Sequence, residues 1–452
     1  MNTLIKNSSK CLLTLWAGLT IVLLIRWNRI CSVEPVTKIY HVPRAWNTDA
    51  PDRQMGSATR EYQPDQLHCQ NRPIDNVTNS PQSHAIRGSN IISNASIVLI
   101  VAYMRTGSTL LGEILREVPE SFYIFEPLRT IESKFNRQNT GDKKNKSVEI
   151  NTADNITRLL DKNSAVDQSI KSILTCHLES LEYDILTDRH HALFKDSMKD
   201  AVQCARGNIN KGNKLKNLLL KTNGTSKAKL EEDIEHANND IRLCLAKEKE
   251  LCSNSFIIVI KTIRLRMRRV LQLIPHFPNM KVIHLLRDPR GMFQSWANTG
   301  FRADFSQIAK ECHTLSTNIA ISKSIIHQYP EKLKIIQYEE LAEFPYATTK
   351  EIFDFVGLAF SEKIQKFLSN KTSSETHGSA YDTNRRNSTE TASKWRKNIS
   401  FADAQTIDAI CVENNEVLGY LPVKTEQELR NMSLSLRIRQ NVTQALIKSY
   451  EF

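Results

Sequence analysis

The stretch that decides the fold is Ser96–Leu115, which reads SIVLIVAYMRTGSTLLGEIL. Its first part, Ile97–Val101, is a continuous run of β-branched and leucyl residues, which is typical of a parallel strand buried on both faces. The polar segment Arg105–Thr109 then interrupts the run. The apolar residues that follow have helical spacing: Leu110, Leu111, Ile114 and Leu115. The sequence therefore predicts a buried strand, a tight loop and a helix.

The loop of this unit has the composition of an anion-binding site. Backbone N–H groups point outward at a helix N-terminus, and the helix dipole favours negative charge there. Gly107 lets the backbone approach an anion closely, and Arg105 can grip a phosphate or sulfate with two parallel N–H bonds. Ser108 or Thr109 can cap the helix and donate to an oxygen. No lysine follows the glycine, so the loop is not a Walker A motif, and a chance RTGST in an ordinary turn is the alternative.

A second stretch, Lys281–Trp296 (KVIHLLRDPRGMFQSW), repeats the pattern. It predicts a strand over Val282–Leu286 and a helix that begins near Gly291. Arg287 opens the loop, and Ser295 lies about one turn into the helix, where it can face back toward the loop. Two such anion sites in one α/β body indicate a ligand with phosphates at both ends.

Two further apolar runs predict strands of the same sheet. Phe122–Leu128 (FYIFEPL) carries Glu126 at its end, and a carboxylate there lies at the mouth of an α/β sheet, where ligands bind. The alternative is a solvated loop glutamate. Ser255–Ile260 (SFIIVI) is the other run. His284 lies in the middle of a strand, which favours a buried core histidine over a catalytic one. The expected fold is α/β, with a P-loop-like central parallel sheet flanked by helices.

The composition indicates which classes of ligand the protein is suited to bind. The 452 residues suffice for a large domain, and a net charge of +12 favours anionic partners or is simply a solvated basic surface. Aromatic residues make up only 7% of the chain and no basic segment interleaves with them, which argues against nucleic acid. The wide cysteine spacing matches no metal site.

The N-terminal part predicts a membrane anchor. Residues 11–30 are mostly apolar and lack a cleavage site, which favours an uncleaved transmembrane signal anchor behind a cytosolic tail of residues 1–10. Residues 31–89 are polar with several prolines and predict a stem. The folded body is expected over 90–452, with a helical insert or lid at 138–252.

Glycosylation signals and cysteines indicate an oxidising, lumenal compartment. N-x-[S/T] sequons follow the anchor at Asn76, Asn94, Asn145, Asn155, Asn223, Asn370, Asn387, Asn398, Asn431 and Asn441. The cysteines allow several disulfides, and their pairing cannot be derived from the sequence. We expect Cys312 to pair with Cys411, and pairs to form among Cys176, Cys204, Cys244 and Cys252.

Together, RTGST…FEPL and RDPRG…S resemble the 5′-phosphosulfate and 3′-phosphate loops of the Golgi carbohydrate sulfotransferases. The nearest group sulfates the 6-hydroxyl of galactose, N-acetylgalactosamine or N-acetylglucosamine. Further similar segments are Lys261–Arg264, Gln337–Leu341 with Pro345, and Trp395-Arg396 followed by Cys411 and Leu418–Tyr420. Gln337 departs from the family, which usually has arginine there. RTGST also varies the usual R-S-G-S-S, and the insert resembles no member.

The resemblance implies a donor, 3′-phosphoadenosine 5′-phosphosulfate (PAPS), and transfer of its sulfuryl group to a sugar hydroxyl. Arg105 and the amides of Thr106–Thr109 (Thr106, Gly107, Ser108 and Thr109) would hold the 5′-phosphosulfate, with Arg105 also stabilising charge on the bridging oxygen. Arg287 and Ser295 would hold the 3′-phosphate, and Glu126 would be the base for the acceptor hydroxyl. Weaker candidates for contacts to the nucleotide or glycan are Lys261, Arg264, Arg385, Arg386 and Arg396, and a plain surface role is the alternative for each of them.

The resemblance also implies a glycan acceptor such as chondroitin or keratan sulfate, no metal, and a single-pass type II protein of the Golgi membrane; a homo-oligomer is compatible with it. Two other function classes stay open at this point. A lumenal P-loop kinase would share the anion sites, but the chain lacks a Walker lysine and a clear Mg²⁺ site. A catalytically inactive relative would bind glycan or nucleotide without turnover.

Overall fold

The computed structural model describes residues 95–138, 147–154, 156–222, 225–301, 303–375, 378–379 and 382–448. These residues belong to one unit of the chain, Ile86–Phe452. The predicted tail, anchor and stem at 1–89 lie outside the described residues. Within the described part, no helix combines the length and the apolar character needed to cross a bilayer.

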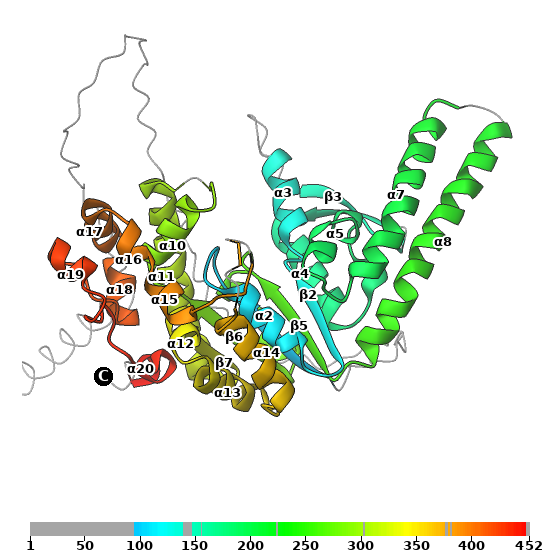
Figure 1. Cartoon of the computed structure of the whole chain (residues 1–452). Coiled ribbons are helices and arrows are strands. Elements are labelled where there is room, and N and C mark those ends of the chain that lie inside the picture. Colours follow the sequence, from blue (N-terminus) through cyan, green and yellow to red (C-terminus); the bar gives the residue numbers. More distant parts are fainter. Residues whose placement is uncertain are drawn as a thin grey trace, which may run out of the picture. The chain divides into compact units, whose positions relative to one another are not determined.

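A five-stranded sheet forms the centre of this unit (Figure 1). Its order is β2-β5-β1-β6-β7, and every neighbouring pair is parallel. The strands are β1 (Ser96–Val101), β2 (Ser121–Phe125), β5 (Ile257–Thr262), β6 (Met280–Leu286) and β7 (Leu333–Gln337). The structure confirms the parallel sheet and the four predicted strands. The fifth strand, β7, was not predicted.

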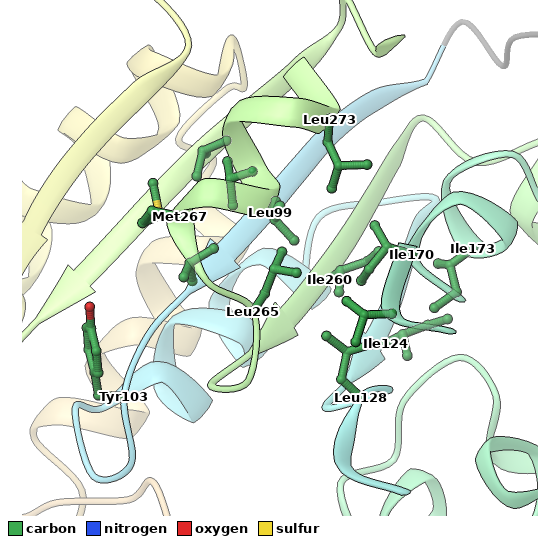
Figure 2. Packing of buried hydrophobic residues seen from close by; sticks show 14 of the residues in the cluster. Leu99, Tyr103, Ile124, Leu128, Ile170, Ile173, Ile260, Leu265, Met267 and Leu273 are labelled. Carbon is green, nitrogen blue, oxygen red and sulfur yellow. The ribbon is translucent and has the colours of Figure 1, made fainter. Parts of the chain in front are cut away.

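Helices cover both faces of the sheet, because successive residues of a strand point to opposite faces. In β1, Leu99 and Val101 face one buried cluster, whereas Val98 and Ile100 face the other. The first cluster joins strand residues to the helix after β5 and to the insert; Figure 2 shows Leu99, Ile124 and Ile260 facing Leu265, Met267, Leu273, Ile170 and Ile173. The second cluster covers the opposite face with α2, α13 and α14.

The helices that cover the sheet are α2 (Ser108–Arg116), α3 (Arg129–Gln138), α9 (Met267–Leu273), the 3₁₀ turn η2 (Ile274–His276), α10 (Pro289–Ala297), α11 (Phe305–Gln328), α12 (Tyr338–Glu343), α13 (Pro345–Val356) and α14 (Glu362–Thr372). The C-terminal part adds α15 (Ser388–Ser393), α16 (Trp395–Asn398), α17 (Phe401–Ile410), α18 (Val412–Leu418), α19 (Glu426–Arg430) and α20 (Val442–Lys448). As expected, Cys312 of α11 is bonded to Cys411, between α17 and α18.

The insert at 138–252 is helical in large part, but not entirely. It contains an antiparallel hairpin, β3 (Ser147–Asn151) and β4 (Thr157–Asp161), which corrects the purely helical prediction. The strands were missed because only Val148 and Ile150 of β3 are buried, too few for a strand signal. The helices are α4 (Lys162–Leu174), η1 (Leu178–Ser180), α5 (Tyr183–Leu186), α6 (His190–Leu193), α7 (Lys199–Leu219) and α8 (Thr225–Ser253).

Two disulfides hold the insert together, and both pairs come from the predicted group. Cys176 is bonded to Cys252, and Cys204 is bonded to Cys244. The second bond joins α7 to α8, the long antiparallel pair in Figure 1. Bonds of this kind stabilise the fold mainly by restricting the unfolded chain.

The insert also covers the edge strand β2. Tyr123 of β2 exchanges two hydrogen bonds with Ser197, each 2.9 Å, and the Phe125 amide donates to Asp196 Oδ2 at 3.0 Å. The same carboxylate oxygen lies 2.5 Å from Nδ1 of the buried His191. An edge strand that would otherwise present unpaired backbone groups is therefore satisfied by the insert.

The His191–Asp196 pair should make the folding stability of the protein depend on pH. Burial by itself lowers the pKa of His191, but the Asp196 charge and hydrogen bond outweigh it, so the pKa is raised above its ordinary value. Stability from the pair should be full below about pH 6.5, the pKa in the unfolded chain, and should be lost as pH rises through the higher folded value. When measured by urea unfolding at several pH values, the free energy of unfolding of His191→Asn should fall less with rising pH than that of the wild type. His177→Asn, at an exposed histidine, is the control. Equal declines in all three proteins would contradict the assignment.

Candidate functional site

A cavity of about 570 Å³ lies at the carboxyl ends of all five strands. Its volume is that of an ordinary ligand pocket. The sequence-predicted residues that line it are Arg105, Gly107, Ser108, Thr109, Glu126, Arg287 and Ser295. They come from the ends of β1, β2 and β6 and the helices that follow. The structure thus brings six of the seven donor-site candidates, and the proposed base, to one place.

Thr106 is the exception. Its side chain is fully buried and donates to the Tyr103 carbonyl at 2.8 Å. Its backbone N–H is directed to the same carbonyl at 3.4 Å. Thr106 therefore holds the turn in shape, and its amide is not available in the way the prediction required.

The first loop presents its amides through an unusual backbone. Arg105 has φ +70° and Gly107 has φ +76°, which is the left-handed region. Helix α2 begins after Gly107, and no side chain caps it, so the expected capping by Ser108 or Thr109 is wrong. The uncapped first turn of α2 lines the cavity instead. Helix N-termini with unsatisfied N–H groups attract anions.

A glycine is also needed at position 107 because Tyr338, at the start of α12, lies directly against it. A Cβ added at Gly107 would lie 2.6 Å from Tyr338 Cε2, and still closer to Cδ2 of the ring.

Gly107→Ala should therefore distort the loop and abolish tight binding of adenosine 3′,5′-bisphosphate, measured by calorimetry. Gly357→Ala is the matched control, because Gly357 has the same φ but nothing within 4 Å of its added Cβ. The control should lose about 1–2 kcal/mol of stability and keep nucleotide binding; equal binding by Gly107→Ala would contradict the close fit.

The two anion loops are joined to each other. Arg105 Nε donates to Ser295 Oγ at 2.9 Å, and Arg287 NH1 donates to the Arg105 carbonyl at 2.7 Å. Ser295, which was expected to hold the 3′-phosphate together with Arg287, thus also contacts the first loop. The two sites form one continuous surface and not two separate pockets.

Arg287 has the features of an anion-binding side chain. It is 8% exposed, and its guanidinium stacks on the Tyr338 ring, 4.5 Å from the centroid. Its Nε is buried and has no hydrogen-bond partner among the described residues. A buried donor without a partner is costly, so a bound acceptor group is the expected compensation. This geometry fits an anionic ligand.

Glu126 lies just past β2, with φ +51°. It is 4% exposed and accepts from Lys261 Nζ at 2.6 Å, from Arg264 NH1 at 2.7 Å and from the Ile263 amide at 3.1 Å. The register explains these contacts, because Phe125 of β2 lies opposite Lys261 of β5. Burial lowers the pKa of Lys261, with Arg264 and Arg105 adding to the shift and Glu126 opposing it. The carboxylate thus has the cations of the cavity as direct neighbours.

The cavity as a whole is strongly basic. Of the residues that the structure describes, two carboxylates line it, Glu126 and Asp382, against eight cationic residues: Arg105, Arg129, Lys261, Arg264, Arg287, Lys371, Arg385 and Lys394. Three of the five weaker candidates, Lys261, Arg264 and Arg385, are among them. A cleft lined by one sign of charge concentrates ligands of the opposite sign.

The other candidates have structural roles or lie elsewhere. Arg396 donates to the carbonyls of Glu428, Leu429, Asn431 and Leu434, so it fixes the C-terminal segment and the predicted ligand contact is wrong. Arg386 is exposed and outside the cavity lining.

His284 is fully buried between the Tyr103 and Ser322 hydroxyls, and burial lowers its pKa to about 3, which confirms a core histidine. Gln337 donates to the Leu418 carbonyl at 3.0 Å and lies outside the cavity lining. The departure from the family pattern at this position therefore concerns packing.

The aromatic walls of the site were not predicted from the sequence. Tyr338 and Trp395 line the cavity, and Trp395 lies 3.1 Å from a Cβ added at Gly291 in the second loop. Both lie in segments quoted for the resemblance, but no local pattern marks an aromatic residue as part of a wall. Among the described residues, no group of three or more histidine, cysteine or carboxylate side chains could hold a metal ion.

Comparisons with known proteins agree with this geometry. A family model described as "Sulfotransferase family" matches residues 98–362. Mouse (Mus musculus) carbohydrate sulfotransferase 1 is 27% identical over 372 residues, which are 76% of this chain and 84% of the relative. Human (Homo sapiens) carbohydrate sulfotransferase 3 is 24% identical over 366 residues, which are 75% and 70% of the two chains.

Among solved structures, the sulfotransferase domain of a Synechococcus olefin synthase is 17% identical, with a TM-score of 0.32 over 80% of this chain and 96% of that one. The family match is the stronger finding, since it spans more than half of the chain and includes both anion loops, Glu126 and Tyr338. The chain belongs to the sulfotransferase family.

Proposed function

We propose that this protein transfers a sulfuryl group from PAPS to the 6-hydroxyl of galactose, N-acetylgalactosamine or N-acetylglucosamine in a glycan such as chondroitin or keratan sulfate. The observation that carries the donor assignment is the joined pair of loops, in which Arg287 Nε is buried with no partner in the described part of the chain and the first turn of α2 is uncapped. A donor with phosphates at both ends would satisfy both groups at once.

The acceptor assignment has separate support. The relatives are named as carbohydrate sulfotransferases, and this chain aligns with most of their length. The 6-hydroxyl is proposed from the resemblance of the first loop, RTGST, to the group that acts at this position. The basic cavity suits an anionic polymer such as a glycosaminoglycan.

In the proposed mechanism, the residues position the reactants and stabilise charge. Arg105 and the amides of α2 hold the 5′-phosphosulfate, and Arg287 selects a nucleotide with a 3′-phosphate. The acceptor oxygen forms a bond to sulfur while the bond from sulfur to the bridging phosphate oxygen breaks. Glu126 takes the proton of the acceptor hydroxyl, and Arg105 stabilises the charge left on the bridging oxygen. The arginines supply the counter-charge, so no metal is proposed.

We further propose that the protein is anchored in the Golgi membrane by residues 11–30, with its body in the lumen. The three disulfides found among the described residues suit an oxidising compartment. Sequon asparagines in the described residues are exposed, as glycan attachment requires: Asn370, Asn387, Asn398, Asn431 and Asn441.

The test is a transfer assay with the full chain, expressed in a eukaryotic host and solubilised in detergent. It is incubated with radiolabelled PAPS and chondroitin, keratan or N-acetylglucosamine-terminated acceptors, and the label is mapped by disaccharide analysis. Label on a 6-hydroxyl supports the proposal and identifies the sugar. Nucleotide binding without any transfer would favour an inactive relative, and Mg²⁺-dependent transfer from ATP would favour a kinase.

A further inference from the structure

A second cavity, of about 320 Å³, lies beside the first. It is bounded by α3 and by insert residues between 184 and 206, and Arg129 lines both cavities. The residues around it are almost all polar: Arg129, Thr130, Ser133, Arg137, Asp184, Thr187, Asp188, Arg189 and Arg206. The proposed mechanism uses none of them.

Helix α3 separates its polar and apolar residues, and the polar face points to this cavity. Arg129, Ser133 and Arg137 are four residues apart and share one face, while Ile131 and Phe135 are buried in the core. A helix rises about 1.5 Å per residue, so this face extends roughly 12 Å from the first cavity. The face is therefore long enough to follow a linear ligand.

The charge of the second cavity is positive after its own ion pairs are considered. Asp188 accepts from Arg129 Nε at 2.8 Å and from Arg129 NH2 at 2.7 Å. Burial by itself would raise the pKa of Asp188, but hydrogen bonds from Arg129 and His190 lower it to about 2, so this carboxylate is ionised and balanced by Arg129. Asp184 lies 3.7 Å from Lys134. Both acids are thus already paired with cations.

Two arginines of the cavity have no such partner. Arg189 and Arg206 are exposed, and neither forms an ion pair with any residue that the structure describes. The hydroxyl of Thr130 is a second unsatisfied group, since its oxygen is buried and makes no hydrogen bond within the described parts of the chain. Guanidinium and hydroxyl groups are the donors that bind sulfate and carboxylate oxygens.

We propose that this second cavity is an acceptor subsite. It binds an anionic substituent, a sulfate or a carboxylate, on a sugar next to the one being sulfated, and this inference rests on the proposed function. Arg189 and Arg206 provide the donors. Arg129 connects this subsite to the transfer cavity, so one oligosaccharide can occupy both. The subsite is built from the polar face of α3 and from insert residues, which makes the insert a determinant of acceptor choice.

The test measures binding and so does not depend on turnover. The full chain, saturated with adenosine 3′,5′-bisphosphate, is titrated with three tetrasaccharides: sulfated keratan, the same sugar after desulfation, and hyaluronan, which carries carboxylates only. Arg189→Gln/Arg206→Gln should weaken binding of at least one anionic sugar by about tenfold or more, and should leave the neutral sugar unchanged. The anionic sugar affected most identifies the group, sulfate or carboxylate.

The control is Lys211→Gln/Lys214→Gln, which removes the same charge from exposed positions of α7 outside the cavity. Equal losses in the two double variants, or wild-type affinity in the arginine variant, would overturn the subsite. Arginine-dependent binding in a protein that transfers no sulfuryl group would support the anion site and refute the proposed function. The experiment therefore distinguishes a failure of the subsite from a failure of the proposed function.

Discussion

Glu126→Gln is expected to lower kcat by about 10²–10⁴-fold while adenosine 3′,5′-bisphosphate still binds. The amide keeps the size of the side chain but cannot take the proton of the acceptor hydroxyl. The hydrogen bonds that Glu126 accepts come from Lys261, Arg264 and the Ile263 amide, whereas the phosphates of the nucleotide are assigned to Arg105 and Arg287. Single-turnover kinetics and calorimetry with the same preparation separate the two effects.

A structural role of Glu126 needs its own control, because the carboxylate pairs with the buried Lys261. Removing one partner of a buried pair leaves an uncompensated charge and costs about 3–5 kcal/mol. The double variant Glu126→Gln/Lys261→Met removes this charge and should recover thermal stability without recovering kcat. Recovery of turnover in the double variant would mean that Glu126 only balances Lys261, and full turnover in the single variant would place the base elsewhere.

Arg287→Gln is expected to weaken binding of adenosine 3′,5′-bisphosphate by roughly 10- to 100-fold, which is the usual size of a lost hydrogen bond to a charged group. Arg287→Lys should recover little of this loss, because an ammonium has no planar fork and stacks poorly on Tyr338. Isothermal calorimetry measures both variants. Arg386→Gln is the control, since Arg386 is an exposed arginine outside the cavity lining.

The choice of nucleotide makes this experiment specific. If Arg287 binds the 3′-phosphate, its replacement should leave the affinity for 5′-AMP, which lacks that group, nearly unchanged. Arg287 also donates to the Arg105 carbonyl, so a variant that merely deforms the first loop would lose both nucleotides equally. Equal losses would therefore reject the assignment of the 3′-phosphate to Arg287.

Much of the sheet and both anion loops could be predicted from local sequence. Runs such as Ile97–Val101 and Val282–Leu286 are unambiguous, because a strand buried on both faces has to be apolar at every position. The break at Arg105 and the break at Arg287 then place each loop at the carboxyl end of its strand. Loop chemistry and strand position are both encoded within about twenty residues, so the site's location followed from the sequence.

Arg396 could not be assigned from local sequence, because the carbonyls that it binds in α19 and the following loop lie 32 and 35 residues later in the chain. Thr106 is a different case, since its hydroxyl closes a local turn onto Tyr103, three residues earlier. The hairpin β3–β4 was missed because its strands are half-exposed and polar. Long polar stretches carry weak periodicity, and tertiary packing decides their structure.

The sequence by itself determined the parallel sheet, the two anion loops and the family, because these depend on apolar periodicity and on short motifs. Only the tertiary structure decided which groups meet in the cavity. The parallel register sets Glu126 against Lys261, which is 135 residues away in the chain, and α12 brings Tyr338 beneath Gly107 and Arg287. Contacts at such separations arise from strand order and helix packing, and neither is written in any local stretch of residues.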